Sequence, residues 1–581
     1  MVMPAITSVF NDGIFAEQFE RYRRDPSSVD ETWRQYFRIA ESLFGTAAAP
    51  AAGVTAGTDV SLLAKVAAAA SLQQAIRMFG HYAVQLDPLG TPPAGADELT
   101  PEFHGLTEAD LARIPGAALG DERFATAKDV IDRKRAVYQN RIGYEVWHLE
   151  VNEERNWFRR AFRDGILTRP LTVDEKKQVL RRLNEVDGLE RFLGRAYQGY
   201  KRFSVEGTDA LIPMLDAMVD ALGREGADEI VIGMAHRGRL NVLTNVMGKP
   251  FEALFAEFEG HHDAAIESGT GDVKYHMGYN GVRSVEGREV KLRLVPNPSH
   301  LEVVNPVVEG VVRALQRDAA HPGTRDEHRV VPVAIHGDAA FPGEGIVAET
   351  LNISHLNAYR TGGTIHIIVN NQVGFTTDPS DARSTYYASD LAKGFEMPIF
   401  HVNADDAEAC IQAMRLACAY RAAFKKDVLI DLVGYRRHGH NEGDEPMYTQ
   451  PTRTAAIRQH PTVPQVWAKR IVSEGVLTAD EAAAVEKDVA QRYADIHARF
   501  KQSLLGSEKH APWPAEGAPT PRPVSTVVPA ERLQFINESL LQWPQDLTPN
   551  PRLAKQLERR REAMGEQGGI EWGHAEALAF G

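Results

Sequence analysis

Cysteine and long apolar runs are nearly absent from this chain of 581 residues. The two cysteines, Cys410 and Cys418, lie eight positions apart in a segment of strongly helical composition, residues 407–423. More than two helical turns separate them, which exceeds the span of a disulfide, so we predict two core thiols and not a redox pair or a metal site. No stretch approaches the roughly 18 apolar residues that cross a bilayer, which excludes a membrane span.

Positive charge is also in deficit, because 65 lysines and arginines face 79 aspartates and glutamates, for a formal net charge of −14. The average surface field therefore repels polyanions and provides no basic footprint for nucleic acid, and a small anion would need a local pocket. The first 15 residues lack a cationic region followed by an apolar block, so we expect neither a secretory signal nor a transit peptide. The predicted location is the cytoplasm, or the mitochondrial matrix in a eukaryote.

Short apolar, β-branched segments alternate with helical patterns between residues 207 and 502. This alternation predicts an α/β fold, a parallel sheet with helices on both faces, preceded by a helical region at residues 101–200. Ligands of such sheets bind beyond the carboxyl ends of the strands. The expected strands are 229–233, 292–295, 330–335, 364–369, 399–402 and 428–433, and expected helices include 173–192, 345–358 and 405–423.

The two ends of the chain differ in composition from the centre. Aromatic residues recur on both sides of a break at residues 26–30, which predicts two short helices in residues 11–38. They form either a hairpin that caps a domain or a docking arm with aromatic anchors for a partner protein. Six prolines between residues 504 and 530 predict an extended connector, and residues 572–579 an amphipathic helix. The aromatic residues of the N-terminal segment are Phe15, Phe19, Tyr22, Trp33, Tyr36 and Phe37.

A β-helix-β unit carries the first candidate chemistry. The strand VVPVAIHGD ends at Asp338 and the strand TIHIIVNN at Asn371, so both residues are expected at the carboxyl ends of neighbouring parallel strands. A carboxylate, an amide oxygen and a main-chain carbonyl form a ligand set suited to Mg²⁺. Gly343 and Gly345 allow a phosphate to approach the backbone, and the following helix supplies free N–H groups. We predict a diphosphate held through a metal, and not a P-loop, because no GxxxxGK[ST] run occurs.

Each half of this pattern also arises for conformational reasons alone, because Gly-Asp forms turns and Asn-Asn ends strands. Together, GDA, the spacing of 33 residues and NNQVGF resemble the thiamine diphosphate signature, with Ala339 at a position that marks one subgroup. Further stretches identify that subgroup: IGMAHRGRLNVL (232–243), SGTGDVKYHMG (268–278), NPSHLEVVNPVVEG (297–310), IHGDAA (335–340), FTTDPSDARST (375–385), FHVNADD (400–406) and RRHGHNEGDEP (436–446).

These stretches resemble the first, decarboxylating component of the 2-oxoglutarate dehydrogenase complex, and the resemblance runs from the N-terminal arm to the last residue. It implies the diphosphate-binding half of a thiamine diphosphate-binding fold, with thiamine diphosphate and Mg²⁺ as cofactors. The metal ligands implied are the side chains of Asp338 and Asn371 and the carbonyl of Val373. The implied catalytic residues are His236, His276 and His300, and the implied cofactor contacts are Arg237, Asp338, Ala339, Asn371 and His440.

This set of side chains suits a dicarboxylate, because imidazole N–H groups and a guanidinium bind two carboxylates, and a histidine also moves protons. The adjacent His261 and His262 lie on an acidic stretch and receive no role. Glu344 is a departure, since the family more often has glutamine there. A carboxylate beside a diphosphate adds like charge unless Mg²⁺ or Arg237 offsets it, so a phosphate contact by residue 344 stays open.

The implied function is oxidative decarboxylation of 2-oxoglutarate in the tricarboxylic acid cycle, with succinyl transfer to a lipoyl group of the succinyltransferase core. The family's paired active sites imply a homodimer. One alternative changes the substrate to 2-oxoadipate or, less fittingly, to pyruvate, which has no distal carboxylate. Another is a cofactor-binding fragment or split subunit that is inactive without a complementary C-terminal chain.

The expected organisation follows from these patterns. Residues 571–581, EWGHAEALAFG, resemble the opening helix of the second α/β domain that grips the thiamine pyrimidine ring in this family. The expected segments are a docking arm (1–40), a linker with a short helix (41–100), a helical region (101–200), an α/β diphosphate- and Mg-binding domain (201–505), a proline-rich connector and helix (506–560), and the start of a truncated pyrimidine-binding domain (561–581).

Overall fold

A computed structural model shows two compact units, one within residues 1–515 and one within residues 516–581. Some sequence expectations fall outside the described residues: those on Phe15 and Tyr36, on His261 and His262, on His300 and on most of the proline-rich connector. The described residues are 18–19, 21–31, 33–34, 37–38, 60–165, 168–260, 274–297, 301–317, 324–505, 525–549, 551–565 and 568–581.

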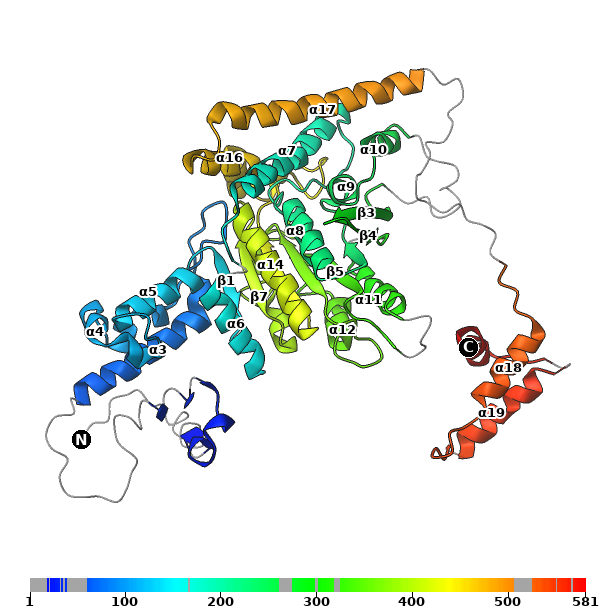
Figure 1. Ribbon diagram of the computed structural model, residues 1–581. Coiled ribbons are helices and arrows are strands. Elements are labelled where there is room, and N and C mark those ends of the chain that lie inside the picture. The colour runs from blue at the N-terminus through cyan, green and yellow to red at the C-terminus, as the bar shows by residue number, and fades with distance from the viewer. Residues whose placement is uncertain are drawn as a thin grey trace. The chain divides into compact units, whose positions relative to one another are not determined.

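An eight-stranded sheet forms the centre of the first unit, in the order β1-β7-β8-β6-β5-β2-β4-β3 (Figure 1). The neighbours from β7 to β4 are parallel, whereas β1 pairs antiparallel with β7 and β3 antiparallel with β4. The α/β fold class and all six predicted strands are confirmed; the two antiparallel edge strands were not predicted. The strands are β1 (Ile142–Glu145), β2 (Glu229–Met234), β3 (Tyr279–Val285), β4 (Arg288–Leu294), β5 (Val330–Gly337), β6 (Ile365–Asn370), β7 (Ile399–Asn403) and β8 (Val428–Val433).

Helices precede the sheet, cover it and follow it. The predicted helix after Thr172 is α7, where a reciprocal capping box between Thr172 and Glu175 satisfies free N–H groups of the first turn. Helix α12 ends at Ile353, five residues earlier than predicted. The α-helices of this unit are α3 (Val60–Phe79), α4 (Glu108–Arg113), α5 (Ala127–Tyr138), α6 (Asn152–Asp164), α7 (Val173–Ala196), α8 (Leu211–Arg224), α9 (Arg239–Asn241), α10 (Phe251–Phe258), α11 (Val304–Leu315), α12 (Gly345–Ile353), α13 (Pro379–Ala382), α14 (Ala407–Phe424), α15 (Pro451–Gln459), α16 (Val463–Ser473) and α17 (Ala479–Leu505).

Short helical turns connect several of these elements. They are the 3-10 turns η1 (Pro26–Ser28), η2 (Gly80–Ala83), η3 (Asp97–Leu99), η4 (Glu102–His104), η5 (Gly116–Leu119), η7 (Asp390–Phe395) and η8 (Pro446–Tyr448), and the π-helical segment η6 (Val242–Val246).

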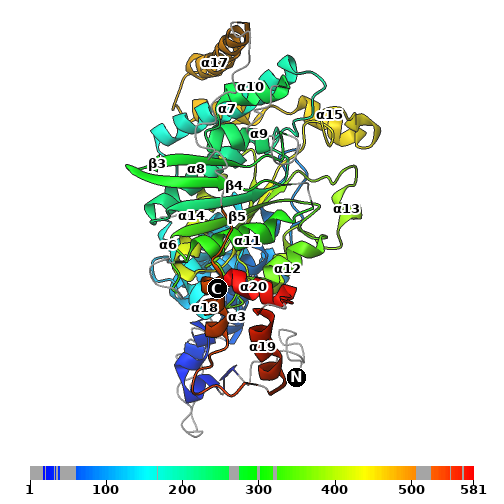
Figure 2. The same cartoon turned by 90° about the vertical axis from the view of Figure 1, so that its right-hand side faces the viewer.

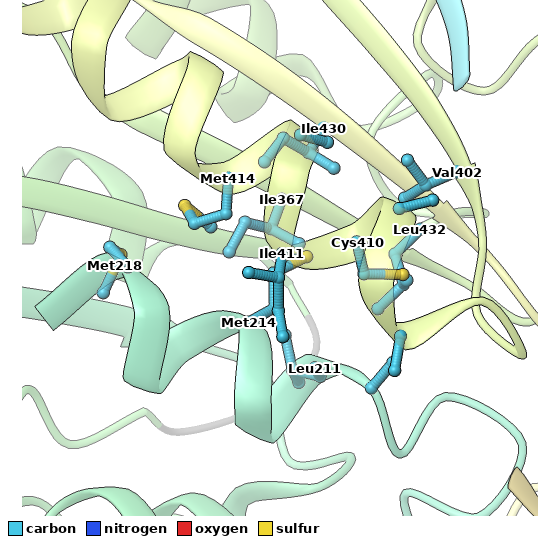
Figure 3. Close-up of a cluster of buried hydrophobic side chains, with 14 of the residues drawn as sticks. Leu211, Met214, Met218, Ile367, Val402, Cys410, Ile411, Met414, Ile430 and Leu432 are labelled. Atoms are coloured by element: carbon cyan, nitrogen blue, oxygen red, sulfur yellow. The ribbon is translucent and has the colours of Figure 1, made fainter. Parts of the chain in front are cut away.

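Helices cover both faces of the sheet (Figure 2). On one face α8 and α14 build an apolar core, in which Met214 and Met414 lie among residues of β6, β7 and β8 (Figure 3). Cys410 and Cys418 are buried free thiols in this layer, as predicted. Burial raises the pKa of Cys418 to about 12. On the other face, α11, α12 and η7 pack in two smaller apolar clusters. Helix α3 is longer than the short helix expected in residues 41–100, and its Leu72 is fully buried in the main core.

The N-terminal arm has a small core of its own. Its described residues are helical on both sides of η1, as predicted. The ring of Phe37 lies 5.1 Å from those of Phe19 and Tyr22 and 5.4 Å from that of Trp33, measured between centroids. Tyr22 and Phe37 are buried in this cluster, so these two aromatic side chains hold the arm together.

The second unit consists of the helices α18 (Ala530–Leu540), α19 (Pro551–Ala563) and α20 (Trp572–Phe580). The predicted amphipathic helix is α20, but its buried residues are His574 and Leu578, whereas Trp572 is 85% exposed. His574 Nε2 lies 2.9 Å from Asn537 Oδ1 of α18, so α20 packs on a helix of its own unit. None of the helices in the described part of the chain is both long and apolar enough to cross a membrane.

Candidate functional site

The structure brings Asp338 and Asn371 together at the carboxyl ends of β5 and β6. The two strands are parallel neighbours, with Gly337 opposite Val369, so the residues that follow them emerge side by side. The backbone N–H of Asn371 interacts with the Asp338 carboxylate, and both side chains are buried, at 3% and 7% exposure. The arrangement expected from the sequence spacing is therefore present.

Two buried polar groups at this edge of the sheet carry a free-energy cost unless they bind a ligand. Burial raises the pKa of Asp338 to about 6, although Arg383 and the Asn371 N–H lower it. Asn371 Oδ1 is buried without a hydrogen-bond partner among the described residues. A buried acceptor without a partner carries a desolvation cost, which a metal ion or a donor would offset. The oxygen-rich donor set fits Mg²⁺ in its chemistry.

The other metal ligand implied by the resemblance lies in the same turn. Val373 is buried, and Gln372, between it and Asn371, has a left-handed backbone with φ of 61°. Among the described residues, no cluster of three or more histidine, cysteine, aspartate or glutamate side chains could hold a metal. A site at this edge therefore depends on one carboxylate combined with amide and carbonyl oxygens.

Three arginines are close enough to Asp338 to interact with its charge. Arg383 lowers its pKa, and Arg237 and Arg436 also interact with its charge. Arg237 donates to the carbonyls of Ser204 and His440, at 3.2 and 2.7 Å, and thereby joins the loop after β2 to the loop after β8. Burial and the nearby Arg436 lower the pKa of Arg237 to about 10, which leaves it charged at neutral pH. This concentration of cations suits an anion such as a diphosphate.

The histidines expected at the site gather around Phe203. The Phe203 ring centroid lies 4.0 Å from that of His236 and 5.6 Å from that of His440. The ring of Tyr275 contacts Phe203 at 4.8 Å and that of the adjacent His276 at 5.1 Å. The structure thus joins three of the four predicted histidines through aromatic contacts.

The loop before α12 carries the remaining expected features. Ala339 is exposed beside the buried Asp338. Gly345 begins α12, and a Cβ added there would meet no atom within 4 Å. Glu344 is half-buried at the N-cap, and burial together with the charge of Glu302 raises its pKa to about 7. Within the protein, the charge that opposes ionisation of Glu344 is that of Glu302, and a phosphate contact by residue 344 stays an open expectation.

Sequence reasoning missed Gln372, Arg383 and Arg436. The two arginines lie in FTTDPSDARST and RRHGHNEGDEP, stretches that carried the family resemblance, so a signal was available. Gln372 lies in NNQVGF, which also carried the resemblance, but its left-handed backbone, a conformation that favours glycine, could not be read from that motif.

Comparison with known proteins identifies the family. Residues 181–505, more than half of the chain and nearly all of the sheet, match the dehydrogenase E1 component family. This chain belongs to that family. A second match, to the 2-oxoglutarate dehydrogenase N-terminus, covers residues 15–42 of this E1 family member.

Relatives of this E1 family member are similar along nearly its whole length. It is 44% identical to a 2-oxoglutarate dehydrogenase E1 component of Exiguobacterium sp. and 43% identical to one of Bacillus cereus. It is 42% identical to the corresponding protein of Bacillus mycoides. Each match covers 98% of this chain and 61% of the relative, so the chain spans about three fifths of the length of these relatives.

Proposed function

We propose that this chain holds the diphosphate and Mg²⁺ of thiamine diphosphate in a 2-oxoglutarate dehydrogenase E1 component. The observation that supports this most is the buried Asp338 carboxyl beside the unpartnered Oδ1 of Asn371. The names of the relatives and the family match support the same assignment.

Each residue has a distinct part in this proposal. The Asp338 carboxylate, Asn371 Oδ1 and the Val373 carbonyl would hold Mg²⁺. Arg237 and Arg436 offset the negative charge of the diphosphate, while Ala339 and His440 contact the cofactor. When bound, thiamine diphosphate supplies the electron sink that stabilises the carbanion left by decarboxylation.

The histidines act on the substrate. His236, His276 and His300 bind substrate carboxylates through imidazole N–H groups and transfer protons at their ring nitrogens. Phe203 packs against His236 and excludes water from one side of its ring. This polar set favours 2-oxoglutarate, with 2-oxoadipate as the alternative dicarboxylate.

The partners follow from the same assignment. The succinyl group passes to the lipoyl group of a succinyltransferase core, and the chain acts as a homodimer in the cytoplasm. The arm at residues 1–40 docks on that core, in keeping with the N-terminal family match at residues 15–42. Deleting residues 1–40 is expected to leave the α/β unit folded and to weaken co-sedimentation with the core; undiminished co-sedimentation would assign the arm a structural role.

Calorimetry tests the cofactor site directly. Thiamine diphosphate is titrated into the purified chain with and without Mg²⁺, and binding is expected only with Mg²⁺. Asp338→Ala is expected to abolish binding, whereas the exposed Asp488→Ala serves as a matched control that binds as the wild type does. Equal affinity of the Asp338→Ala variant would remove this residue from the site.

A separate assay distinguishes the enzyme from a cofactor-binding fragment or split subunit. Release of carbon dioxide from 2-oxoglutarate and from 2-oxoadipate is measured with the purified chain and with the chain in its complex. Turnover by the purified chain alone would exclude the hypothesis of an inactive fragment or split subunit. The ratio of the rates with 2-oxoglutarate and 2-oxoadipate assigns the substrate.

A further inference from the structure

A buried chain of polar side chains runs across β7, β8 and β6 towards the proposed metal site. Glu145 Oε1 lies 2.8 Å from His401 Nε2, and His401 Nδ1 lies 2.9 Å from Asp431 Oδ2. Asn370 Nδ2 donates to Asp431 Oδ1 at 3.0 Å, and Lys393 reaches Glu145 from the other end at 2.5 Å. These five residues are called the His401 chain below.

Two buried members of the His401 chain, His401 and Glu145, are held in their charged forms. Burial opposes a charge on His401, but its bonds to Asp431 and Glu145 raise its pKa to about 9. Burial likewise opposes ionisation of Glu145, yet His401, His81 and Lys393 lower its pKa to about 2. His401 and Asp431 are both fully buried. Buried ion pairs contribute little net stability compared with apolar residues, so this arrangement needs an explanation beyond the packing of the sheet.

The end of the His401 chain indicates such a role. A carboxylate only accepts hydrogen bonds, so Asp431 sets the orientation of the Asn370 amide and directs its oxygen away. That oxygen, Asn370 Oδ1, accepts the backbone N–H of Gln372 at 3.1 Å. The oriented amide thus holds the backbone immediately after Asn371.

The side-chain amide nitrogen and the main-chain carbonyl of Gln372 are also held by hydrogen bonds. Its side-chain amide donates to Asp87 Oδ1 at 2.9 Å and to the carbonyl of Gly434 at 2.8 Å. Its carbonyl accepts from Arg453 Nη1 at 2.9 Å. A non-glycine residue with positive φ is strained, and these four hydrogen bonds hold it in that conformation.

We propose that Gln372, held by the His401 chain, is a positioning residue that presents Asn371 Oδ1 and the Val373 carbonyl to one cation. This inference rests on the proposed function. It explains why a strained turn lies between the two expected metal ligands. It also explains why the side-chain oxygens of the neighbouring Asn370 and Asn371 differ in hydrogen bonding. Asn370 Oδ1 is bonded to the turn, whereas Asn371 Oδ1 is buried and has no hydrogen-bond partner in the part of the chain that the structure describes.

Two substitutions of one residue separate strain from side-chain anchoring. Gln372→Ala and Gln372→Gly both remove the bonds to Asp87 and Gly434, but only glycine adopts positive φ without strain. Loss of a residue that orients a metal ligand typically weakens metal binding by about ten- to hundredfold, which we expect for Gln372→Ala. The Gln372→Gly variant is expected to bind the metal ion more tightly than the Gln372→Ala variant does. The control is Glu286→Gly, which relieves the same kind of strain (φ 51°) in the β3–β4 hairpin and should bind as the wild type does.

The probe is Mn²⁺ in place of Mg²⁺, followed by electron paramagnetic resonance at saturating thiamine diphosphate, with thermal unfolding measured in parallel. Absence of Mn²⁺ binding by the wild type overturns the proposed function itself. If the wild type binds Mn²⁺ and both Gln372 variants bind it as tightly as the wild type does, the positioning role is wrong. Lower unfolding temperatures with unchanged Mn²⁺ affinity would show a purely structural turn and would also overturn the inference.

Hydrogen exchange supplies a readout that needs no cofactor. Amide exchange in the peptide that spans residues 370–374 is expected to be faster in Gln372→Ala than in the wild type, because the turn loses its anchors. An unchanged exchange rate in this peptide would contradict the anchoring on which the inference depends.

Discussion

The two faces of the central sheet differ in chemistry, although the same strands supply both. On the α8 and α14 face, β6 and β8 contribute apolar residues such as Ile367 and Ile430 (Figure 3). One position along each strand, His366 and Asp431 turn to the opposite face, since side chains alternate across a strand. The α8 and α14 face of these strands is therefore apolar, whereas the opposite face combines smaller apolar clusters with buried polar and charged side chains that lead towards the edge with the proposed metal ligands.

A second polar chain reinforces this difference. His336 of β5 lies 2.7 Å from Glu302 through Nδ1 and 2.9 Å from His366 through Nε2, and His366 lies 3.4 Å from Asp427. Glu302 Oε1 accepts the N–H of Gly337, next to Asp338, at 3.2 Å. Both polar chains thus end on backbone N–H groups beside a proposed metal ligand. Buried polar side chains of this sheet therefore reach the backbone of both loops that bear the proposed metal ligands.

The largest loss of stability is expected when a buried charge is removed from the polar face of the sheet. His401→Leu removes the cation between two buried carboxylates, Glu145 and Asp431, and should lower the free energy of unfolding by about 3–5 kcal/mol. The matched control is Ile430→Leu, next to Asp431 on β8 but on the apolar face, which should cost less than about 1.5 kcal/mol. Urea unfolding at pH 7 measures both. Equal losses in the two variants would show that the buried charges do not distinguish the faces.

The second prediction is the contribution of His401 to the pH dependence of stability. The folded pKa of His401, about 9, lies above its ordinary value of 6.5. Its contribution to stability is therefore complete below pH 6.5 and is lost as the pH rises through 9. The loss is on the order of 3 kcal/mol. Denaturant unfolding between pH 6 and pH 9.5 checks this, and a His401→Gln variant should show a flatter profile. Parallel profiles would rule out His401 as the titrating group.

The third prediction concerns the apolar face of the sheet. Ile367→Val removes one buried methylene from the α8 and α14 face and should cost about 0.5–1.5 kcal/mol of unfolding free energy. Thiamine diphosphate affinity should stay unchanged, because this side chain points away from the polar chains. Calorimetry on the folded variant decides; weakened binding would show that the two faces are coupled through the strand.

The smallest expected effect is at the solvent end of the His401 chain. The Lys393 side chain is 32% exposed, so solvent screens its ion pairs with Glu145 and Asp390. Lys393→Met is expected to cost at most about 1 kcal/mol in thermal unfolding. A larger cost would mean that Lys393, and not His401, compensates the buried carboxylates.

The edge strands show where sequence reasoning succeeds and where it stops. Five of the six parallel strands are buried along nearly their whole length and appear in the sequence as largely apolar runs, whereas β4 alternates between buried and exposed positions. By contrast, β3 alternates between half-buried and exposed positions and contains a glycine, and β1 has four residues. Such edges are defined by the strand with which they pair, which a local pattern does not reveal.

In the candidate site too, some contacts could be predicted from the sequence and others could not. The spacing between Asp338 and Asn371 predicted that they meet, because a β-helix-β unit places consecutive parallel strands side by side. The contact of Arg453 with the Gln372 carbonyl and that of Asp431 with Asn370 were not predictable from any motif. Each joins residues from different elements, and the first also requires the left-handed backbone of Gln372.

From the sequence by itself came the α/β class, the six parallel strands, the two buried thiols and the pair of loops that bear Asp338 and Asn371. These are determined locally, by periodicity, composition and the connection between consecutive strands. The tertiary structure alone decided which face of the sheet holds charge and which buried amide oxygen stays unpartnered. Those outcomes depend on atoms that approach one another only after the chain has folded, such as Asp431 and Asn370, which lie 61 positions apart.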